Sequence, residues 1–398
     1  MPSPTEHSKR KCTSLSQVFE GLQIEPTSPS PQINIPSTSL YLAKTLRQYM
    51  RSTLHTGSGT VSPRSLHGVQ AQFKVAMDDS YDYNIGANDF DPDTIFPEII
   101  TLGNQLSTVL QNQLTSDQET ALEDHILHCL ADMVYGSNMI ERVGNGYDIT
   151  LKLCMAIFRG EEIPEDIGET EEEFLELKGN LLRKNLPANT LAILKSRREI
   201  VQHAKAASYI ISQLCVHDQD LSEEIILQTH QILTYKVDAG NTPWKEYSGV
   251  YRTDEVCAGL HQFPHHIMVP NKMKAMIREL DSDLNKAISK GTIDPIAIAS
   301  KYTHIFVNIH PFIDGNGRMC RLILNSILLK LGNFLVCIGD EEEDRSLYLD
   351  IACNAGALED TWGDLDEEER PVMHKELASF VMSHVEKSMR KLVTTMLR

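Results

Sequence analysis

Long apolar runs are missing from this sequence of 398 residues. No stretch approaches the roughly 20 apolar residues that a membrane-spanning helix needs, and the N-terminal segment lacks the apolar core of a signal peptide. The eight cysteines are scattered without a Cys-x-x-Cys pair, and no Asn-x-Ser/Thr glycosylation acceptor occurs. These absences predict a cytoplasmic protein with reduced thiols and no membrane attachment, with the nucleus as the alternative compartment.

Basic residues are also scarce, because 37 Lys and Arg stand against 55 Asp and Glu, for a formal net charge of -18. DNA and RNA are polyanions that bind basic surfaces, so this charge predicts no nucleic-acid partner. Any phosphate site must then be a local group of basic residues in an otherwise acidic protein. The hydrophobic fraction of 41% is ordinary for a soluble protein, and the length allows one large domain or two.

Composition and periodicity divide the chain into four parts. Residues 1–36 are rich in Ser, Thr and Pro and are predicted to be disordered. Residues 37–94 are predicted to hold one helix followed by an irregular linker. Apolar residues at helical spacing then mark a helical region over 95–190 and another over 191–398, which closes with a C-terminal helix. The predicted fold class is mostly α.

Residues suited to catalysis or ligand binding are concentrated in the stretch His310–Arg321, which reads His-Pro-Phe-Ile-Asp-Gly-Asn-Gly-Arg-Met-Cys-Arg. Its two glycines allow backbone conformations in which successive N–H groups converge on an anion. Apolar residues recur at helical spacing over 318–331, so the glycine loop is expected at a helix N-terminus, where free N–H groups favour phosphate. Arg318 and Arg321 can reach phosphate oxygens from one helix face.

Two further side chains of this stretch suit phosphate chemistry. Asp314 supplies a hard oxygen of the kind that holds magnesium beside phosphates. His310 precedes the turn, where a neutral imidazole can take a proton from an incoming hydroxyl. The alternative is a glycine loop before a core helix, with charges that are merely solvated. So many functional identities at fixed spacing favour a nucleotide-phosphate site.

This stretch resembles the motif of the Fic family, His-x-Phe-x-(Asp/Glu)-Gly-Asn-Gly-Arg-x-x-Arg, and meets each of its fixed positions. The resemblance implies a nucleotidyltransferase that moves AMP from ATP to a protein hydroxyl. In that reaction His310 is the general base, Asp314 holds Mg²⁺ or Mn²⁺, and Phe312 anchors the loop. The kinase-like branch of the wider family has lysine at the position of Gly317, so this glycine argues against that branch.

The resemblance also implies which residues contact the nucleotide phosphates. The α- and β-phosphates are expected on Asn316 and on the neighbouring amides of Gly315 and Gly317. The outer phosphates are expected on Arg318 and Arg321.

The adenine contacts are less defined than the phosphate contacts. In relatives, the segment that corresponds to residues 346–354 contacts the adenine. Tyr348 and Asn354 are the candidates there, and both could equally be core or capping residues.

A second motif of the family lies upstream, at the end of an expected helix. The inhibitory motif reads Ser/Thr-x-x-x-Glu followed by Gly or Asn, and this sequence supplies Ser137 and Glu141. In autoinhibited relatives that glutamate pairs with the second motif arginine, here Arg321, and removes a ligand of the γ-phosphate. Arg142 stands where Gly or Asn is usual, which leaves open how the helix ends and whether Glu141 reaches the site. The alternative is a solvated surface glutamate.

Residues 255–270 break the helical pattern and suggest a short β-hairpin. In Fic enzymes the hairpin at this location is the flap, which holds the target segment by strand pairing. The resemblance therefore implies a protein substrate held by the flap. His261, His265 and His266 could suggest zinc, but Pro264 prevents a regular helix and no cysteine lies at ligand spacing.

Together these observations predict a Fic-type helical bundle with a small β-hairpin flap over the active site. Residues 95–190 carry the inhibitory motif, and residues 191–398 form the Fic catalytic domain and C-terminal helix. The predicted function is AMP transfer from ATP to a Ser, Thr or Tyr hydroxyl, autoinhibited by Glu141. Two alternatives stay open, removal of AMP from a modified protein at the same site and a nucleotide-binding module without turnover. Because relatives often dimerise, a homodimer is a further expectation.

Overall fold

The computed structural model describes residues 40–53, 60–66, 69–85, 90–258, 261–363, 365 and 369–397. The segment 1–36, which the sequence predicts to be disordered, lies outside these ranges. The described residues are mostly helical, as predicted. The helices are α1 Leu42–Thr53, α2 Pro92–Gln111, α3 Ser116–Ile140, α4 Tyr147–Phe158, α5 Glu172–Arg183, α6 Thr190–Ile211, α7 Glu223–Leu233, α8 Trp244–Tyr247, α9 Val269–Lys290, α10 Pro295–Ile309, α11 Asn316–Gly332, α12 Glu342–Trp362 and α13 Lys375–Met396.

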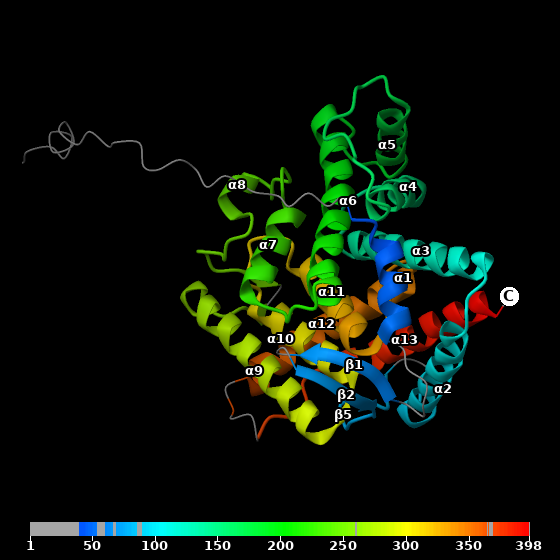
Figure 1. Ribbon diagram of the computed structural model, residues 1–398. Coiled ribbons are helices and arrows are strands. Elements are labelled where there is room, and N and C mark those ends of the chain that lie inside the picture. The colour runs from blue at the N-terminus through cyan, green and yellow to red at the C-terminus, as the bar shows by residue number, and fades with distance from the viewer. Residues whose placement is uncertain are drawn as a thin grey trace, which may run out of the picture. The chain divides into compact units, whose positions relative to one another are not determined.

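Helix α11 is the buried centre around which the other helices pack (Figure 1). Every residue of α11 except Gly317 is buried, and the helix contacts α3, α6 and α10. A helix that is covered on all sides belongs to the core. It ends at Gly332, and Asn333 takes the left-handed conformation that stops the helix, with φ 59°. The first turn of α11 is thereby held rigidly inside the bundle.

Side-chain caps start the helices that surround α11. Thr115 and Gln118 form a reciprocal capping box at the start of α3. Ser222 accepts from the N–H of Ile225 at the start of α7. Asp294 accepts from two backbone N–H groups at the start of α10. Each cap pairs donors that the helix itself leaves unpaired, so the boundaries of these helices are encoded locally.

The region 37–94 differs from the prediction of a helix and an irregular linker. Strands β1 Thr60–Leu66 and β2 Val69–Val75 pair as an antiparallel hairpin, and β2 pairs in parallel with β5 Thr292–Ile293. The strand order is β1-β2-β5. Proline is tolerated in edge strands, and Pro63 lies in the edge strand β1, where the register shifts. This proline and the distant partner β5 explain why the sequence pattern did not reveal the sheet.

The flap region contains the predicted hairpin. Strands β3 Cys257–Ala258 and β4 His261–Gln262 pair in antiparallel fashion, with Cys257 opposite Gln262. A short 3₁₀ helix over His266–Met268 leads from the hairpin into α9. The flap is thus a small strand pair joined directly to a long helix of the bundle.

Candidate functional site

The proposed base, His310, follows α10 directly. Its backbone is in the left-handed conformation, with φ 48° and ψ 61°, which turns the chain sharply into the motif loop. Its Nδ1 lies 3.3 Å from the carbonyl oxygen of Val307. When Nδ1 carries the proton and donates it to that oxygen, Nε2 becomes the acceptor nitrogen of the ring.

The flap covers the imidazole of His310. The ring of Phe263 stacks on it with centroids 3.9 Å apart and an interplanar angle of 18°. Burial lowers the pKa of His310 to about 4, and the charge of Arg252 acts in the same direction. The imidazole is therefore neutral near pH 7, which is the form that accepts a proton.

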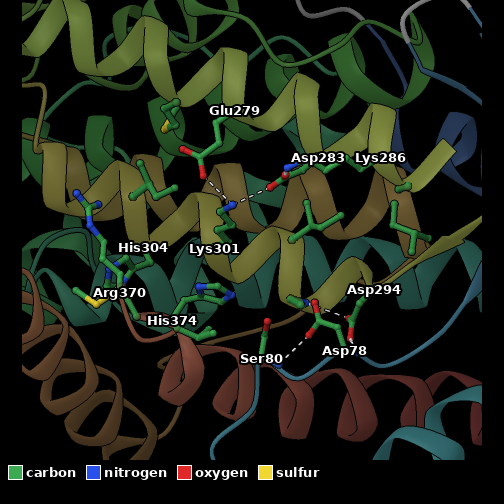
Figure 2. Close-up of a pocket in the computed structure, with 18 of the residues that line it drawn as sticks. Asp78, Ser80, Glu279, Asp283, Lys286, Asp294, Lys301, His304, Arg370 and His374 are labelled. Carbon is green, nitrogen blue, oxygen red and sulfur yellow. Dashed lines mark hydrogen bonds and ion pairs between the residues drawn. The ribbon is translucent and has the colours of Figure 1, made fainter. Parts of the chain in front are cut away.

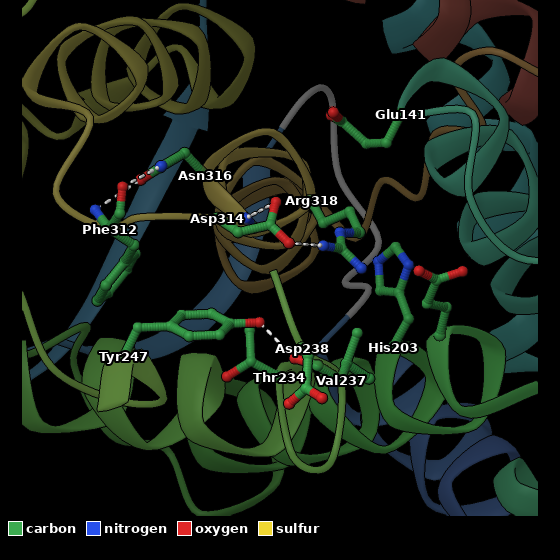
Figure 3. A network of polar contacts seen from close by, with 12 residues as sticks. Glu141, His203, Thr234, Val237, Asp238, Tyr247, Phe312, Asp314, Asn316 and Arg318 are labelled. Atoms are coloured by element: carbon green, nitrogen blue, oxygen red, sulfur yellow. Dashed lines mark hydrogen bonds and ion pairs between the residues drawn. The ribbon is translucent and has the colours of Figure 1, made fainter. Parts of the chain in front are cut away.

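Asn316 closes the loop that follows His310, as Figure 3 shows. Its side-chain oxygen accepts from the backbone N–H of Phe312 at 2.9 Å, and its amide donates to the carbonyl of Phe312 at 2.8 Å. The ring of Phe312 is fully buried, in keeping with an anchor. Both polar atoms of the Asn316 side chain are therefore engaged within the loop. Its backbone N–H is the group left for the predicted phosphate contact.

The loop leads into the first turn of α11 through Gly315, whose φ of 82° lies in the region that favours glycine. The first N–H groups of a helix have no partners within the helix, so those of Asn316, Gly317 and Arg318 form an anion-binding end. The carboxylate of Asp314 accepts from the N–H of Gly315 at 2.7 Å, and its side chain is 42% exposed.

Arg318 is buried with part of its hydrogen-bonding capacity unused. Its Nη2 pairs with Asp314 at 3.3 Å, while Nε and Nη1 have no partner. Leaving buried N–H groups of a guanidinium unpaired costs about 1–3 kcal/mol for each group. Figure 3 shows the side chain extending between Asp314 and His203. Burial and the charge of Arg318 lower the pKa of His203, which is neutral and cannot act as the missing anion. Among the described residues, Nε and Nη1 of Arg318 thus have no acceptor within hydrogen-bonding distance.

Arg321, one turn further along α11, is contacted by the end of α3 through Nε and Nη2, while its Nη1 has no partner. Its Nε donates to the hydroxyl of Ser137 at 2.8 Å, and its Nη2 donates to the Ser137 carbonyl at 2.9 Å. The same Nη2 pairs with the carboxylate of Glu141 at 2.6 Å. The structure thus brings together the three residues that the inhibitory motif predicts, in the arrangement expected for an occupied Arg321.

The end of α3 is shaped for this contact despite the departure at Arg142. Helix α3 ends at Ile140, and Arg142 takes the left-handed conformation, with φ 55°, that Gly or Asn takes more easily. A Cβ at Gly317 would overlap an oxygen of the Glu141 carboxylate. Gly317 is therefore the residue that lets Glu141 lie against the first turn of α11.

The two adenine candidates lie in different surroundings. Tyr348 of α12 is buried, and its ring centroid lies 5.4 Å from the guanidinium carbon of Arg321. Asn354 is exposed and donates to Glu376 of α13 at 3.0 Å. The structure brings Tyr348, but not Asn354, against a residue of the motif.

Arg252 is a site residue that the sequence reasoning missed. Its Nε donates to the carbonyl of His310 at 2.8 Å, its Nη1 donates to the carbonyl of Asp254 at 2.8 Å, and its Nη2 donates to the carbonyl of Pro264. Its backbone N–H donates to Pro311 at 2.9 Å. The side chain is 2% exposed. Arg252 therefore ties the flap to the loop of the base, across contacts that no local pattern reveals.

His230 of α7 is a second missed residue. Its ring stacks on Phe312 with centroids 3.6 Å apart, and its Nε2 donates to the carbonyl of Asp314 at 2.9 Å. Its Nδ1 accepts from the N–H of Gly249 at 2.9 Å. Burial lowers its pKa to about 4, so the ring is neutral. The only sequence signal is a histidine on the apolar face of a helix, which is more often a core residue.

The donor set at the start of α11 fits a magnesium ion held beside phosphates, because such ions use one or two carboxylates together with substrate oxygens. Asp314 is the half-exposed carboxylate at this place. Among the residues that the structure describes, no three His, Cys, Asp or Glu side chains gather in a group that could hold a metal ion. In the same part of the chain, no helix is long and apolar enough to span a membrane.

Comparisons with known proteins show which family the segment containing this site resembles. The model of the Fic/DOC family matches residues 220–328, which contain the flap and the motif His310–Arg321. The chain thus contains a segment that matches the Fic/DOC family. It is similar to a Fido domain-containing protein of Dictyostelium discoideum, with 39% identity over 84 residues, 21% of this chain and 56% of that protein. It is also similar to the protein adenylyltransferase Fic of Drosophila yakuba, with 28% identity over 182 residues, 43% of this chain and 34% of that protein.

The fold of the chain agrees with solved structures. A Fic domain-containing signaling protein from Bacteroides thetaiotaomicron has a TM-score of 0.55 at 17% identity, covering 75% of this chain and 97% of that chain. Fic-1 from C. elegans has a TM-score of 0.51 at 21% identity, covering 77% and 73%. At these identities the likeness concerns the fold. The matched segments span about a third to a little over half of the curated relatives' length.

Proposed function

We propose that this protein transfers AMP from ATP to a protein hydroxyl and is held inactive by Glu141. One observation carries the proposal: the neutral His310 lies beside a helix N-terminus at which the buried Arg318 has two unpartnered N–H groups. A proton-accepting imidazole next to N–H groups that can bind phosphate suits the attack of a hydroxyl on phosphorus. The similarity to proteins named protein adenylyltransferase supports the same class of reaction.

In the proposed reaction, Nε2 of His310 accepts the proton of the target hydroxyl. The hydroxyl oxygen forms a bond to the α-phosphorus of ATP, the bond to the bridging oxygen breaks, and pyrophosphate leaves. The first N–H groups of α11 and the guanidinium of Arg318 stabilise the negative charge that develops on the phosphate oxygens. Phe263 and the other residues packed around His310 exclude water from its imidazole.

Asp314 would hold the magnesium ion, which supplies charge neutralisation of the phosphates when it is bound. His230 holds the carbonyl of the same residue and so fixes the direction of its side chain. Arg318 pairs with the Asp314 carboxylate in this structure. The residues present thus fit a metal-assisted phosphate site.

Restraint would come from the pairing of Arg321 with Glu141. Because Nη2 of Arg321 is occupied by the carboxylate, it is not free for an outer phosphate. The Glu141 side chain is 34% exposed and lies at the end of α3, so its removal leaves no cavity in the core. Replacing it by glycine frees the arginine, and we expect transfer to rise.

The test uses wild type and Glu141→Gly, each incubated with magnesium and with ATP labelled on either the α- or the γ-phosphate. Self-labelling of Glu141→Gly from the α-label alone supports AMP transfer under restraint. Labelling from the γ-label contradicts it, because that phosphate leaves with pyrophosphate. Glu162→Gly, a change of the same kind at an exposed glutamate, is the matched control and should behave as wild type.

Removal of AMP at the same site is the second candidate, and the position of Glu141 favours it. The carboxylate lies against Gly317, within the anion-binding turn, where it could orient a water molecule. Under this function wild type hydrolyses an AMP-modified protein and Glu141→Gly does not. A binding module without turnover gains support if Glu141→Gly binds ATP tightly and forms no product.

A further inference from the structure

Helix α3, which carries Ser137 and Glu141, is seated on the segment that follows α11 by direct backbone contact. A Cβ added at Gly136 would overlap the carbonyl oxygen of Ile338. A Cβ at Gly339 would lie 2.6 Å from a carbon of Ile140. Such close approach needs glycine on both sides and leaves little freedom for a small shift of the helix. Glu141 therefore reaches Arg321 only while α3 stays seated on this segment.

Two cysteines face each other across the same contact. Cys129 lies on α3, and Cys337 lies on the segment after α11. The Sγ of Cys337 donates to the carbonyl oxygen of Cys129 at 3.3 Å. The Sγ of Cys129 lies 3.3 Å from Nε2 of His125. Neither cysteine is in a disulfide in this structure.

The surroundings make this pair chemically unequal. Hydrogen bonding with the thiol of Cys337, and to a lesser extent with His125, lowers the pKa of Cys129 well below its ordinary value. The same pairing raises the pKa of Cys337. Cys129 is 5% exposed, whereas Cys337 is half-buried. A thiol with a lowered pKa in contact with a second, more accessible thiol is an arrangement that favours disulfide formation.

We propose that Cys129 and Cys337 are a site of oxidative modification, at which a peroxide converts the two thiols into a disulfide that fastens α3 in its seated position. The thiolate of one cysteine attacks the peroxide, forms a sulfenic acid and releases water. The second thiol then displaces the hydroxyl of the sulfenic acid, which leaves as a second water molecule. The sulfur atoms lose two electrons in total, and these reduce the peroxide bond.

The consequence for the active site rests on the proposed function. A disulfide holds together two segments that must separate if α3 is to leave α11, so it lowers the fraction of molecules in which Arg321 is free. Oxidation should therefore strengthen restraint by Glu141, and reduction should relieve it. In Glu141→Gly the helix is fastened equally well but carries no carboxylate to occupy Arg321.

The first experiment detects the bond itself. The full chain is treated with hydrogen peroxide, blocked with an alkylating reagent and digested without reductant for mass spectrometry. A linked peptide containing Cys129 and Cys337 that disappears with dithiothreitol supports the site. Both cysteines recovered as alkylated thiols, or linked to other cysteines, would overturn it. Cys129→Ser and Cys337→Ser should each abolish the linked peptide, and Cys353→Ser, at an exposed cysteine, should leave it unchanged.

The second experiment separates the seating of α3 from the reaction. Amide hydrogen exchange over residues 129–141 should slow by about tenfold on oxidation in wild type and in Glu141→Gly, but not in Cys337→Ser. Unchanged exchange in the linked protein would overturn the fastening role. AMP transfer by wild type should fall about tenfold on oxidation and recover with dithiothreitol, while transfer by Glu141→Gly stays the same. If no variant transfers AMP, the proposed function fails, and the exchange measurement still decides the fate of the disulfide.

Discussion

Two regions of this protein gather buried or half-buried charges, and they differ in how completely those charges are paired. The first is a cavity of about 900 Å³ between α9 and α10 (Figure 2). There Lys301 pairs with Glu279 at 2.7 Å and with Asp283 at 2.8 Å. The second is the start of α11 (Figure 3), where Arg318 has two N–H groups without a partner.

The guanidinium of Arg318 keeps hydrogen-bond donors without a partner, whereas Lys301 in the cavity is paired with two carboxylates. A buried cation without its anion costs free energy, so it persists where a ligand supplies the missing charge. The lysine of the cavity is neutralised by the protein itself and has a structural explanation. The arginine of the motif pairs with Asp314 through Nη2, but its Nε and Nη1 have no partner. The comparison can be tested with matched pairs of variants from the two regions.

The largest effect is expected from the base. In the Glu141→Gly background, His310→Ala should lower AMP transfer by about 10²–10⁴-fold, because the hydroxyl then lacks its proton acceptor. The matched change is His304→Ala in the cavity, which removes a pair with Glu359 but no proposed reaction step. We expect His304→Ala to retain transfer. Rates from α-labelled ATP check both, and equal losses would contradict the assignment of the base.

The next effect concerns the two buried cations. Arg318→Met should weaken ATP binding by about 10–100-fold, because charge-assisted hydrogen bonds to phosphate are lost. Lys301→Met should leave ATP affinity unchanged and lower the free energy of unfolding by about 1–3 kcal/mol, since two carboxylates lose their partner. Titration calorimetry and urea unfolding measure the two quantities. Weaker ATP binding by Lys301→Met would place the cavity within the site.

A smaller effect is expected from the arginine that ties the flap to the motif loop. Arg252→Lys keeps the charge but cannot donate to three carbonyls in a fixed fork, so kcat should fall about tenfold while ATP affinity is kept. Arg278→Lys on the exposed face of α9 is the control. A fall in ATP affinity with unchanged kcat would assign Arg252 to nucleotide binding instead.

The last effect concerns stability and not activity, as a pH dependence of the unfolding free energy in the cavity. Burial raises the pKa of Asp294 from 3.8 to about 7, so the folded protein keeps a proton in this interval that the unfolded chain has lost. Its contribution is fully present below 3.8 and is lost as the pH rises towards 7. Relative to Asp294→Asn, wild type should lose up to about 1.4 kcal/mol of unfolding free energy per pH unit. A constant difference between pH 5 and 8 would contradict this.

The histidines of the site should titrate with the opposite sign. His310 and His230 have pKa values of about 4, so in acid the unfolded chain binds protons before the folded protein does. Their contribution is present above the ordinary pKa of 6.5 and is lost as the pH falls towards 4. Asp294 and these two histidines therefore contribute to stability with opposite dependence on pH.

Much of the candidate site could be predicted because most of its residues lie in one short stretch, His310–Arg321. Glycine at 315 permits a left-handed turn, and the apolar spacing after it predicts the buried helix α11. The positions of Ser137 and Glu141 predict a shared helix face one turn apart. These are local properties, which depend on residues a few positions away, and the structure shows the expected turn and helix.

Only the tertiary structure could decide what distant segments bring to that stretch. Arg252 and His230 reach the motif loop from 58 and 84 residues away, and β2 finds its partner β5 far along the chain. No periodic pattern in the sequence reveals these three contacts. A long-range hydrogen bond depends on how whole elements pack and not on the spacing of residues within one element. The sequence by itself determined the reactive loop and the helix that follows it. Packing decided which residues hold that loop, cover its base and occupy its second arginine.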